Sequence, residues 1–380
     1  MLDSSNPFAV KSSLPFGLVD FTQIRPEHYR QAFDVGMAQN LEEIDQIIAQ
    51  TGEPTFENTI IPLELSGQLL NKALLYFFND AGANTNDDIK AIQTEYSPKF
   101  ASHDDDISLN EKLFERIETI YTKRDSLNLD PESLRILEHY YKEFVRSGAK
   151  LSVEDKEKLR AINNELAELT TAYGQNILSE MNDSAVVVDD VSELDGLDAE
   201  QIKAAADEAQ ARGLNGKYLI TLKNTTIQPI LKSLKNRALR EKIYLASISR
   251  GMRGNAADNT QKAFRIAELR TLRANILGYP TYAAYSLDNK VARTVQAVND
   301  MQNQLIEPSK ASLAREAAEL QALIDAENGG FTLAAHDWFY YAEKLENKNT
   351  ILMIMHSSHI LNSTMSYKMA FFMRQISFMV

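Results

Sequence analysis

Residues 152–177, SVEDKEKLRAINNELAELTTAYGQNI, contain the longest regular apolar spacing in the chain. Apolar side chains recur there every three or four residues, at Leu159, Ile162, Leu166, Leu169, Tyr173 and Ile177. This spacing places them along one face of a helix, as in a helix that packs against another helix. Ser152 and Asp155 precede the run at the spacing of a capping pair. The stretch therefore predicts a long, packed helix in a mainly α-helical protein.

The segments on both sides of this helix predict further helices and one small sheet. Helical periodicity covers 26–48, 58–78, 87–100, 109–120 and 131–147, with Pro62 near the start of the second, Pro98 disturbing the third and Gly148 ending the fifth. The predicted strands are 185–188 (AVVV) and 217–222 (KYLITL), with a helix over 198–212 between them. From residue 228 onward the chain is predicted helical, with breaks at 251–254, 278–280, near Pro308 and at 329–330. The predicted fold is mainly α with one β-hairpin-like insertion.

The bulk composition excludes several classes of function. The 380 residues carry a net charge of −13, which argues against a nucleic-acid partner, because such partners bind through Lys and Arg. No cysteine is present, so disulfides, thiolate nucleophiles and cysteine-based zinc sites are excluded. The start, MLDSSNPFAVKSS, does not read as a signal peptide, and no apolar run approaches the roughly 18 residues that span a bilayer. We therefore expect a cytoplasmic protein with no membrane partner.

The composition changes after Leu345. Six of the eleven methionines fall in 346–380, a segment without Gly, Pro or Asp whose charged residues give a net +2. An end of this kind on an Ala-, Glu- and Leu-rich body is what a shifted reading frame produces. We therefore expect three regions: an extended N-terminal arm over 1–25, a helical lobe over 26–345 and an unrelated tail over 346–380.

The residues that could perform hydrolytic chemistry are sparse. None of the six histidines lies in H-E-x-x-H, the helical motif that places two imidazoles and a general base at a zinc ion. His356 and His359 are three residues apart, which would place both rings on one helical face as a metal pair. The simpler interpretation is a chance pair in an unrelated tail. We therefore assign no metal ligand and no catalytic residue.

Four other motifs admit a functional and a structural interpretation. Asp104, Asp105 and Asp106 lack the glycine and glutamate of a calcium loop, so a solvated acidic turn is favoured. His139 is expected to pack beside its neighbouring tyrosines. Residues 338–341 (WFYY) cannot all share one helical face, so we expect some of these rings to pack in the core and some to remain available to a ligand. The charged run 232–242 is most simply a solvated helix face.

Nine fragments together resemble one family of enzymes. They are NPF at 6–8, LPF at 14–16, HYRQAFDVGM at 28–37, TFENTI at 55–60, GAKLSVEDKEKLRAINNELAELT at 148–170, NTTIQPIL at 224–231, RALREKIYLA at 237–246, GYPTYAAYSL at 278–287 and HDWFYYAEKL at 336–345. In order and spacing they resemble peptidyl-dipeptidases (dipeptidyl carboxypeptidases) of the thimet-oligopeptidase-like zinc metallopeptidases. The resemblance covers residues 6–345.

The resemblance implies a two-lobed helical fold, like that of neurolysin and thimet oligopeptidase, with a deep channel. It also implies release of C-terminal dipeptides from short peptides by a zinc ion held by H-E-x-x-H and a further Glu. The chain departs from the family at that motif, so we expect an inactive N-terminal part that binds no zinc, with unknown substrate-binding residues. A non-catalytic helical module that binds a peptide or partner is the alternative. Complementation by a separately made catalytic half is a third, weaker possibility.

Overall fold

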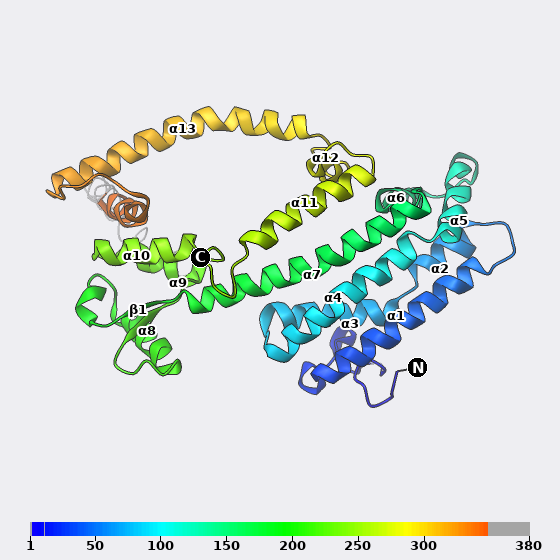
Figure 1. The fold of residues 1–380 in the computed structure, drawn as a ribbon, viewed down its shortest axis with the longest axis horizontal. Coiled ribbons are helices and arrows are strands. Elements are labelled where there is room, and N and C mark those ends of the chain that lie inside the picture. Colours follow the sequence, from blue (N-terminus) through cyan, green and yellow to red (C-terminus); the bar gives the residue numbers. More distant parts are fainter. Residues whose placement is uncertain (1, 11, 349–380) are drawn as a thin grey trace, which may run out of the picture. The chain divides into compact units, whose positions relative to one another are not determined.

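The computed structural model describes residues 2–10 and 12–348, and these residues divide into two compact units (Figure 1). Unit 1 lies within 1–176 and 259–295, and unit 2 within 177–258 and 296–380. Both are built from helices, and the strands described form one two-stranded sheet. The prediction of a mainly α fold with a small β insertion is therefore confirmed. The boundaries predicted at 25/26 and 345/346 stay predictions.

Unit 1 is made of helices that enclose three apolar clusters. Its helices are α1 (Pro26–Ile48), α2 (Ile61–Glu64), α3 (Gln68–Ala83), α4 (Asp87–Ser108), α5 (Glu111–Thr122), α6 (Pro131–Ser147), the first part of α7 (Val153–Asp183), α11 (Thr260–Ile276) and α12 (Tyr282–Leu287). Helices α1, α3 and α4 lie side by side and share a core that includes Phe33, Phe77 and Tyr96 (Figure 1). Leu166 on the predicted long helix packs against Ile266 and Leu269 of α11, as its apolar spacing predicts.

The N-terminal arm packs on this unit through turns and two short 3₁₀ helices, Pro15–Gly17 and Phe21–Gln23. Asn6 is almost fully buried, and its side-chain amide donates to the backbone carbonyl of His28 at 3.0 Å. Phe8 and Val19 are buried in the same cluster as Phe33. The asparagine of the NPF fragment thus joins the arm to the first turn of α1.

Two helices of unit 1 differ from the prediction. The helix predicted over 58–78 is interrupted at Gly67, which has a φ of 69° and separates α2 from α3. The helix predicted to be disturbed at Pro98 instead continues through it to Ser108. Proline removes one helical hydrogen bond, here to the carbonyl of Thr94. Thr94 is exposed, so water can hydrate that carbonyl and the helix continues.

Unit 2 contains the small sheet and several helices. Strands β1 (Val186–Val188) and β2 (Tyr218–Ile220) pair antiparallel, with Val187 opposite Leu219. Its helices are the end of α7, α8 (Ala199–Ala211) between the strands, α9 (Asn224–Ser233), α10 (Arg237–Ile248) and α13 (Val295–Ala326), and residues 338–348 are also helical. The buried faces of the strands pack on α9 and α10. The sheet therefore lies where the sequence predicts it.

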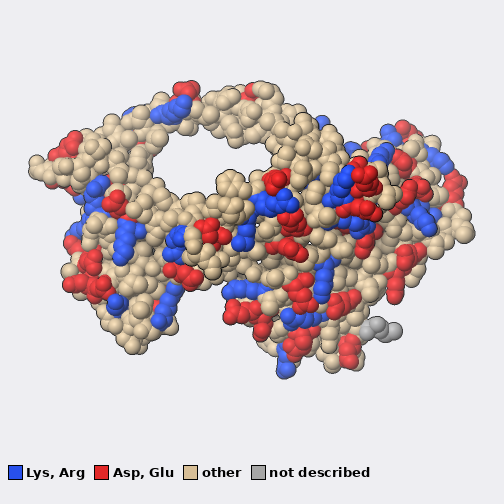
Figure 2. Space-filling model, in the orientation of Figure 1, with Lys and Arg blue, Asp and Glu red and all other residues tan. Residues whose placement is uncertain are grey.

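Helix α13 runs through Pro308, where the sequence predicts a break. Residues 299–311 are exposed around the whole helix, so water can satisfy the carbonyl that Pro308 leaves free. Exposed apolar side chains on this stretch and just beyond it are Met301, Leu305, Ile306 and Leu313. On the face drawn in Figure 2, α13 carries few charged side chains, whereas acidic and basic residues are intermixed elsewhere. None of the described helices has the length and apolar character needed to cross a membrane.

Candidate functional site

Two of the histidines in the described segments form hydrogen bonds with other groups of the chain. His28 accepts a hydrogen bond from the backbone N–H of Arg25 through Nδ1, at 3.1 Å, and so caps α1. The buried His103 ring contacts the side-chain oxygen of Asn40 at 2.9 Å. His139 is exposed on α6, beside the ring of Tyr140. His336 is buried, and His356 and His359 lie outside the described residues.

These residues do not fit the zinc ion that the resemblance implies. Over 2–10 and 12–348, no group of three or more His, Cys, Asp or Glu side chains is placed to hold a metal. No histidine in the 380 residues is followed directly by glutamate, which the H-E-x-x-H motif requires. No chemical step through zinc is therefore assigned to the described residues.

Of the aspartates at 104–106, Asp104 and Asp106 are exposed, as the prediction of solvated residues expects, whereas Asp105 is buried. They lie in the last turns of α4, and Asp105 is only 5% exposed. Asp106 forms a solvent-exposed ion pair with Arg160 at 2.7 Å. Asp104 and Asp105 line a cavity of about 430 Å³ in unit 1, called the polar cavity below. Three consecutive residues of a helix point in different directions, so these three aspartates have different surroundings.

Two arginines and a tyrosine from later in the chain complete the polar cavity. Arg270 and Arg273 lie three residues apart on α11, and Tyr282 is the first residue of α12. The guanidinium of Arg270 lies 5.2 Å from the centre of the Tyr282 ring. Arg273 donates a long bond of 3.4 Å to the hydroxyl of Tyr285. Neither arginine forms an ion pair with a carboxylate of the described chain.

The electrostatics of the cavity are set by burial and by the proximity of like charges. Burial raises the pKa of Asp104 to about 6, and the neighbouring Asp105 carboxylate raises it further in the same direction. Asp104 remains accessible to water because it borders the cavity. Burial also raises the pKa of Asp105, while a 2.7 Å hydrogen bond from Asn163 and the charge of Arg273 oppose that rise.

Asp337 is the centre of a buried ion-pair network in unit 2. Its side chain is fully buried and accepts from Arg237 at 2.9 and 3.1 Å and from Arg240 at 2.8 Å. Arg240 is also buried, at 2% exposure, and donates to the carbonyls of Leu234 and Lys235. The prediction that 232–242 is a solvated helix face is therefore wrong for Arg240. Burial tends to raise the pKa of Asp337, but the two guanidiniums outweigh it and the pKa lies below its usual value.

The aromatic residues 338–341 pack as predicted. Tyr341 is buried against Leu320 and Ile324 of α13, and Trp338 and Tyr340 are partly buried in the same cluster. Phe339 is 39% exposed. The Arg240 guanidinium also lies 4.3 Å from the centre of the Tyr340 ring. The segment is thus anchored by one buried carboxylate and by aromatic packing.

A second buried carboxylate holds the loop that follows α10. Glu180, on the last turn of α7, accepts from Arg253 at 2.7 and 2.8 Å, from Asn255 at 2.6 Å and from the backbone N–H of Gly251 at 3.0 Å. Its side chain is inaccessible to solvent. The hydrogen bonds from Arg253 lower its pKa to about 2, against the opposing effect of burial. The carboxylate therefore stays charged.

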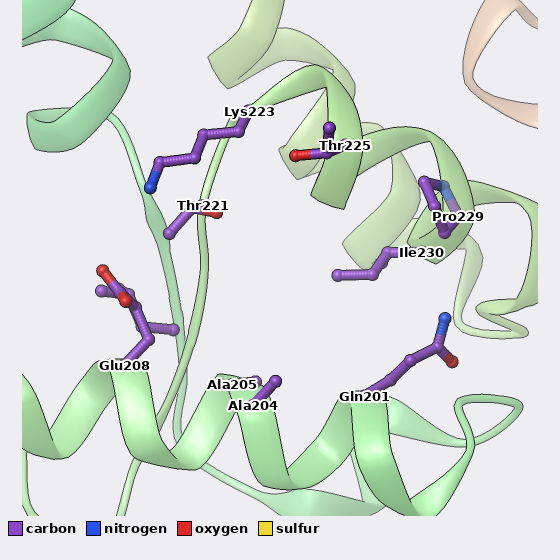
Figure 3. Close-up of a pocket in the computed structure, with 10 residues that line it drawn as sticks. Gln201, Ala204, Ala205, Glu208, Thr221, Lys223, Thr225, Pro229 and Ile230 are labelled. Atoms are coloured by element: carbon purple, nitrogen blue, oxygen red, sulfur yellow. The ribbon is translucent and has the colours of Figure 1, made fainter. Parts of the chain in front are cut away.

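A smaller cavity of about 330 Å³ lies in unit 2 between α8 and the segment that follows β2. Figure 3 shows Gln201 and Glu208 extending from α8, with Lys223 and Thr221 on the side of Glu208 and Ile230 and Pro229 on the side of Gln201. Glu208 already pairs with Arg212 at 2.6 Å. The Gln201 side-chain oxygen accepts a hydrogen bond from the backbone N–H of Asp198, and the Asp198 carboxylate accepts one from the backbone N–H of Gln201, which together cap the start of α8. Since the carboxylate that lines it is already paired, this cavity offers less free polar chemistry than the polar cavity.

Sequence reasoning missed Arg270, Arg273 and Tyr282 as partners of the aspartates. The available signal was the spacing of the two arginines, which places them on one face of a helix. That signal does not identify the helix they face. The contact joins residues more than 160 positions apart, which no local pattern encodes.

Comparison with known proteins shows similarity to peptidases. Residues 230–370 match the family described as Peptidase family M3. The chain is 38% identical over 347 residues to dipeptidyl carboxypeptidase of Escherichia coli (strain K12), which covers 91% of this chain and 51% of that protein. It is 37% identical over 349 residues to dipeptidyl carboxypeptidase of Salmonella typhimurium, covering 92% and 51%. Identity to Escherichia coli oligopeptidase A is 27% over 334 residues, covering 87% and 49%.

The chain spans about half the length of the curated relatives it matches. The range matched by the family extends past Leu345 to residue 370, and the unrelated origin of the tail stays a prediction. The chain is therefore related to the dipeptidyl carboxypeptidases and to Peptidase family M3, as the sequence resemblance predicts.

Proposed function

We propose that these residues form the non-catalytic part of a zinc-dependent peptidyl-dipeptidase that releases C-terminal dipeptides from short peptides. The supporting observation is similarity along 91% of the chain to a dipeptidyl carboxypeptidase, combined with the lack of a set of zinc ligands over 2–10 and 12–348. On this proposal the 380 residues do not cleave peptides by themselves. Resemblance to the bacterial enzymes also supports a cytoplasmic location.

The chemistry of peptide hydrolysis explains why this part should be inactive. Water attacks an amide slowly unless a metal lowers its pKa or a general base removes its proton. In the polar cavity Asp104 and Asp105 are carboxylates, but no histidine lines that cavity, and the nearby His103 contacts Asn40 instead. Two carboxylates beside two arginines favour binding of charged groups over activation of water.

A cleavage assay tests this proposal. The purified chain is incubated with an N-terminally blocked tripeptide and micromolar zinc, and released dipeptide is quantified by mass spectrometry. Escherichia coli dipeptidyl carboxypeptidase, assayed in parallel, is the positive control. We expect no release above the buffer blank. Turnover that a chelator abolishes and zinc restores would contradict the proposal.

A second candidate function is a non-catalytic module that binds a peptide or a protein partner. The observation that favours it is the exposed apolar series Met301, Leu305, Ile306 and Leu313 on α13, since exposed apolar surface often marks an interaction site. Calorimetry with short peptides distinguishes the two candidates. Saturable binding that a Leu305→Ser, Leu313→Ser double variant abolishes, without turnover, would favour the module. Binding that this variant leaves unchanged would count against α13 as its surface.

A further inference from the structure

The polar cavity of unit 1 brings charged groups of both signs together from separate helices. Helix α4 supplies Asp104 and Asp105, α11 supplies Arg270 and Arg273, and α7 supplies Asn163. These two carboxylates and two guanidiniums form no ion pair with one another at 4.0 Å or less. Opposite charges that face one space without pairing leave room for a ligand that carries both charges.

Several polar atoms around this cavity lack a hydrogen-bond partner. Asp105 is 95% buried, and while its Oδ1 accepts from Asn163, its Oδ2 has no partner. Asn163 Oδ1 and Arg273 Nε also lack one. These atoms have almost no accessible surface, so a ligand in the cavity does not contact them directly. The charged groups that it can reach include Asp104 and Arg270.

The accessible groups define what the ligand must present. Asp104 borders the cavity, with Asp105 behind it, so this side suits an ammonium group with several N–H donors. Arg270, held against Tyr282, and Arg273 suit a carboxylate, which guanidinium groups bind in paired hydrogen bonds. We propose that the polar cavity binds a free amino acid by its ammonium group and its carboxylate.

The composition of the cavity argues against other ligand classes. A phosphate or nucleotide would meet two carboxylates, and a divalent cation would meet two guanidiniums. A volume of about 430 Å³ lies within the range of small-molecule sites, which is roughly 300–1,000 Å³. The inference goes beyond the peptidase relationship, because it requires neither zinc nor cleavage. Its failure would therefore leave the cleavage assay unaffected.

Isothermal titration of the full chain with alanine at pH 7.5 tests the inference. We expect saturable binding. The N-acetyl derivative of that compound, which lacks the ammonium, and its amide, which lacks the carboxylate, should each bind at least about tenfold more weakly. These analogues test both charged ends without altering the protein.

Variants of the cavity provide the second arm. Asp104→Asn and Arg270→Gln should each weaken binding about tenfold, and neither side chain forms a hydrogen bond on which the fold depends. Glu168→Gln, at an exposed position of α7 with no polar partner shown, is the matched control and should bind as the unmodified chain does. Absence of saturable heat at about 10 mM, equal binding of the capped analogues, or equal effects of the variants and the control would overturn the proposal.

Discussion

Removing the charge of Asp337 should destabilise unit 2 strongly. The Asp337→Asn substitution keeps the size of the side chain but leaves the Arg240 guanidinium, only 2% exposed, without its counter-ion. Breaking a buried pair by removing one partner costs about 3–5 kcal/mol. The amide still has an oxygen that accepts one hydrogen bond, so we expect about 3 kcal/mol.

Trp338 makes the effect measurable in the relevant unit. It is the only tryptophan in the chain, directly follows Asp337 and packs in the α13 cluster, so its fluorescence follows the unfolding of unit 2. In a urea titration, about 3 kcal/mol should lower the midpoint by about 1–2 M at an unchanged slope. Arg240→Met should cost a similar amount. Arg237→Met should cost less, because the Arg237 side chain is 37% exposed.

A matched control and a double variant separate the ion pair from general effects of substitution. Glu319→Gln changes the same charge at an exposed position of α13 and should shift stability by less than about 0.5 kcal/mol. The double variant Arg240→Met, Asp337→Leu should cost less than the sum of its single changes, since no unpaired charge remains. If Asp337→Asn shifts the midpoint no more than Glu319→Gln does, the network does not stabilise this unit.

Three further predictions follow from individual contacts. Glu180→Gln should destabilise unit 2 by about 2–3 kcal/mol at pH 7. Because the pKa of Glu180 is lowered in the folded state, this difference should disappear as the pH falls from about 4.5 through about 2. Urea midpoints of both proteins at several pH values check this. Gly148→Ala should cost about 1–3 kcal/mol by thermal denaturation, because φ is 104° and the added methyl carbon would lie 2.8 Å from side-chain atoms of Leu151 and Leu159. Asp104→Asn should stabilise unit 1 at pH 8 by up to about 1 kcal/mol, a figure reduced because Asp104 is accessible to solvent, and should have no effect at pH 4. The reason is that the pKa of Asp104 is raised in the folded state, so the unmodified chain loses stability as the pH rises through about 6. Thermal melts of both proteins at each pH check this.

Features that depend on near neighbours could be predicted from the sequence. Asp130 caps α6 by accepting from the backbone N–H groups of Glu132 and Ser133, and Gly148 ends that helix in a left-handed conformation. Ser152 likewise accepts from the backbone N–H of Asp155 at the start of α7. These signals act over three or four residues, so the local sequence determines them.

Features that depend on distant neighbours could not be predicted in this way. Pro308 predicts a break, yet an exposed helix tolerates it because water replaces the lost bond. Arg240 looks like part of a solvated charged run, but its partner Asp337 lies 97 residues later and makes burial possible. Asp105 reads as part of an exposed acidic turn until α7 and α11 cover it. In each case the deciding contact is absent from the local pattern.

The most direct test of the central claim is the number of zinc ions that the purified 380-residue chain retains after equilibrium dialysis against micromolar zinc, measured by mass spectrometry of the metal. The account predicts far less than one zinc per chain, because the described residues contain no set of ligands for it and the sequence contains no H-E-x-x-H. One tightly held zinc per chain, together with chelator-sensitive release of dipeptides, would contradict the account.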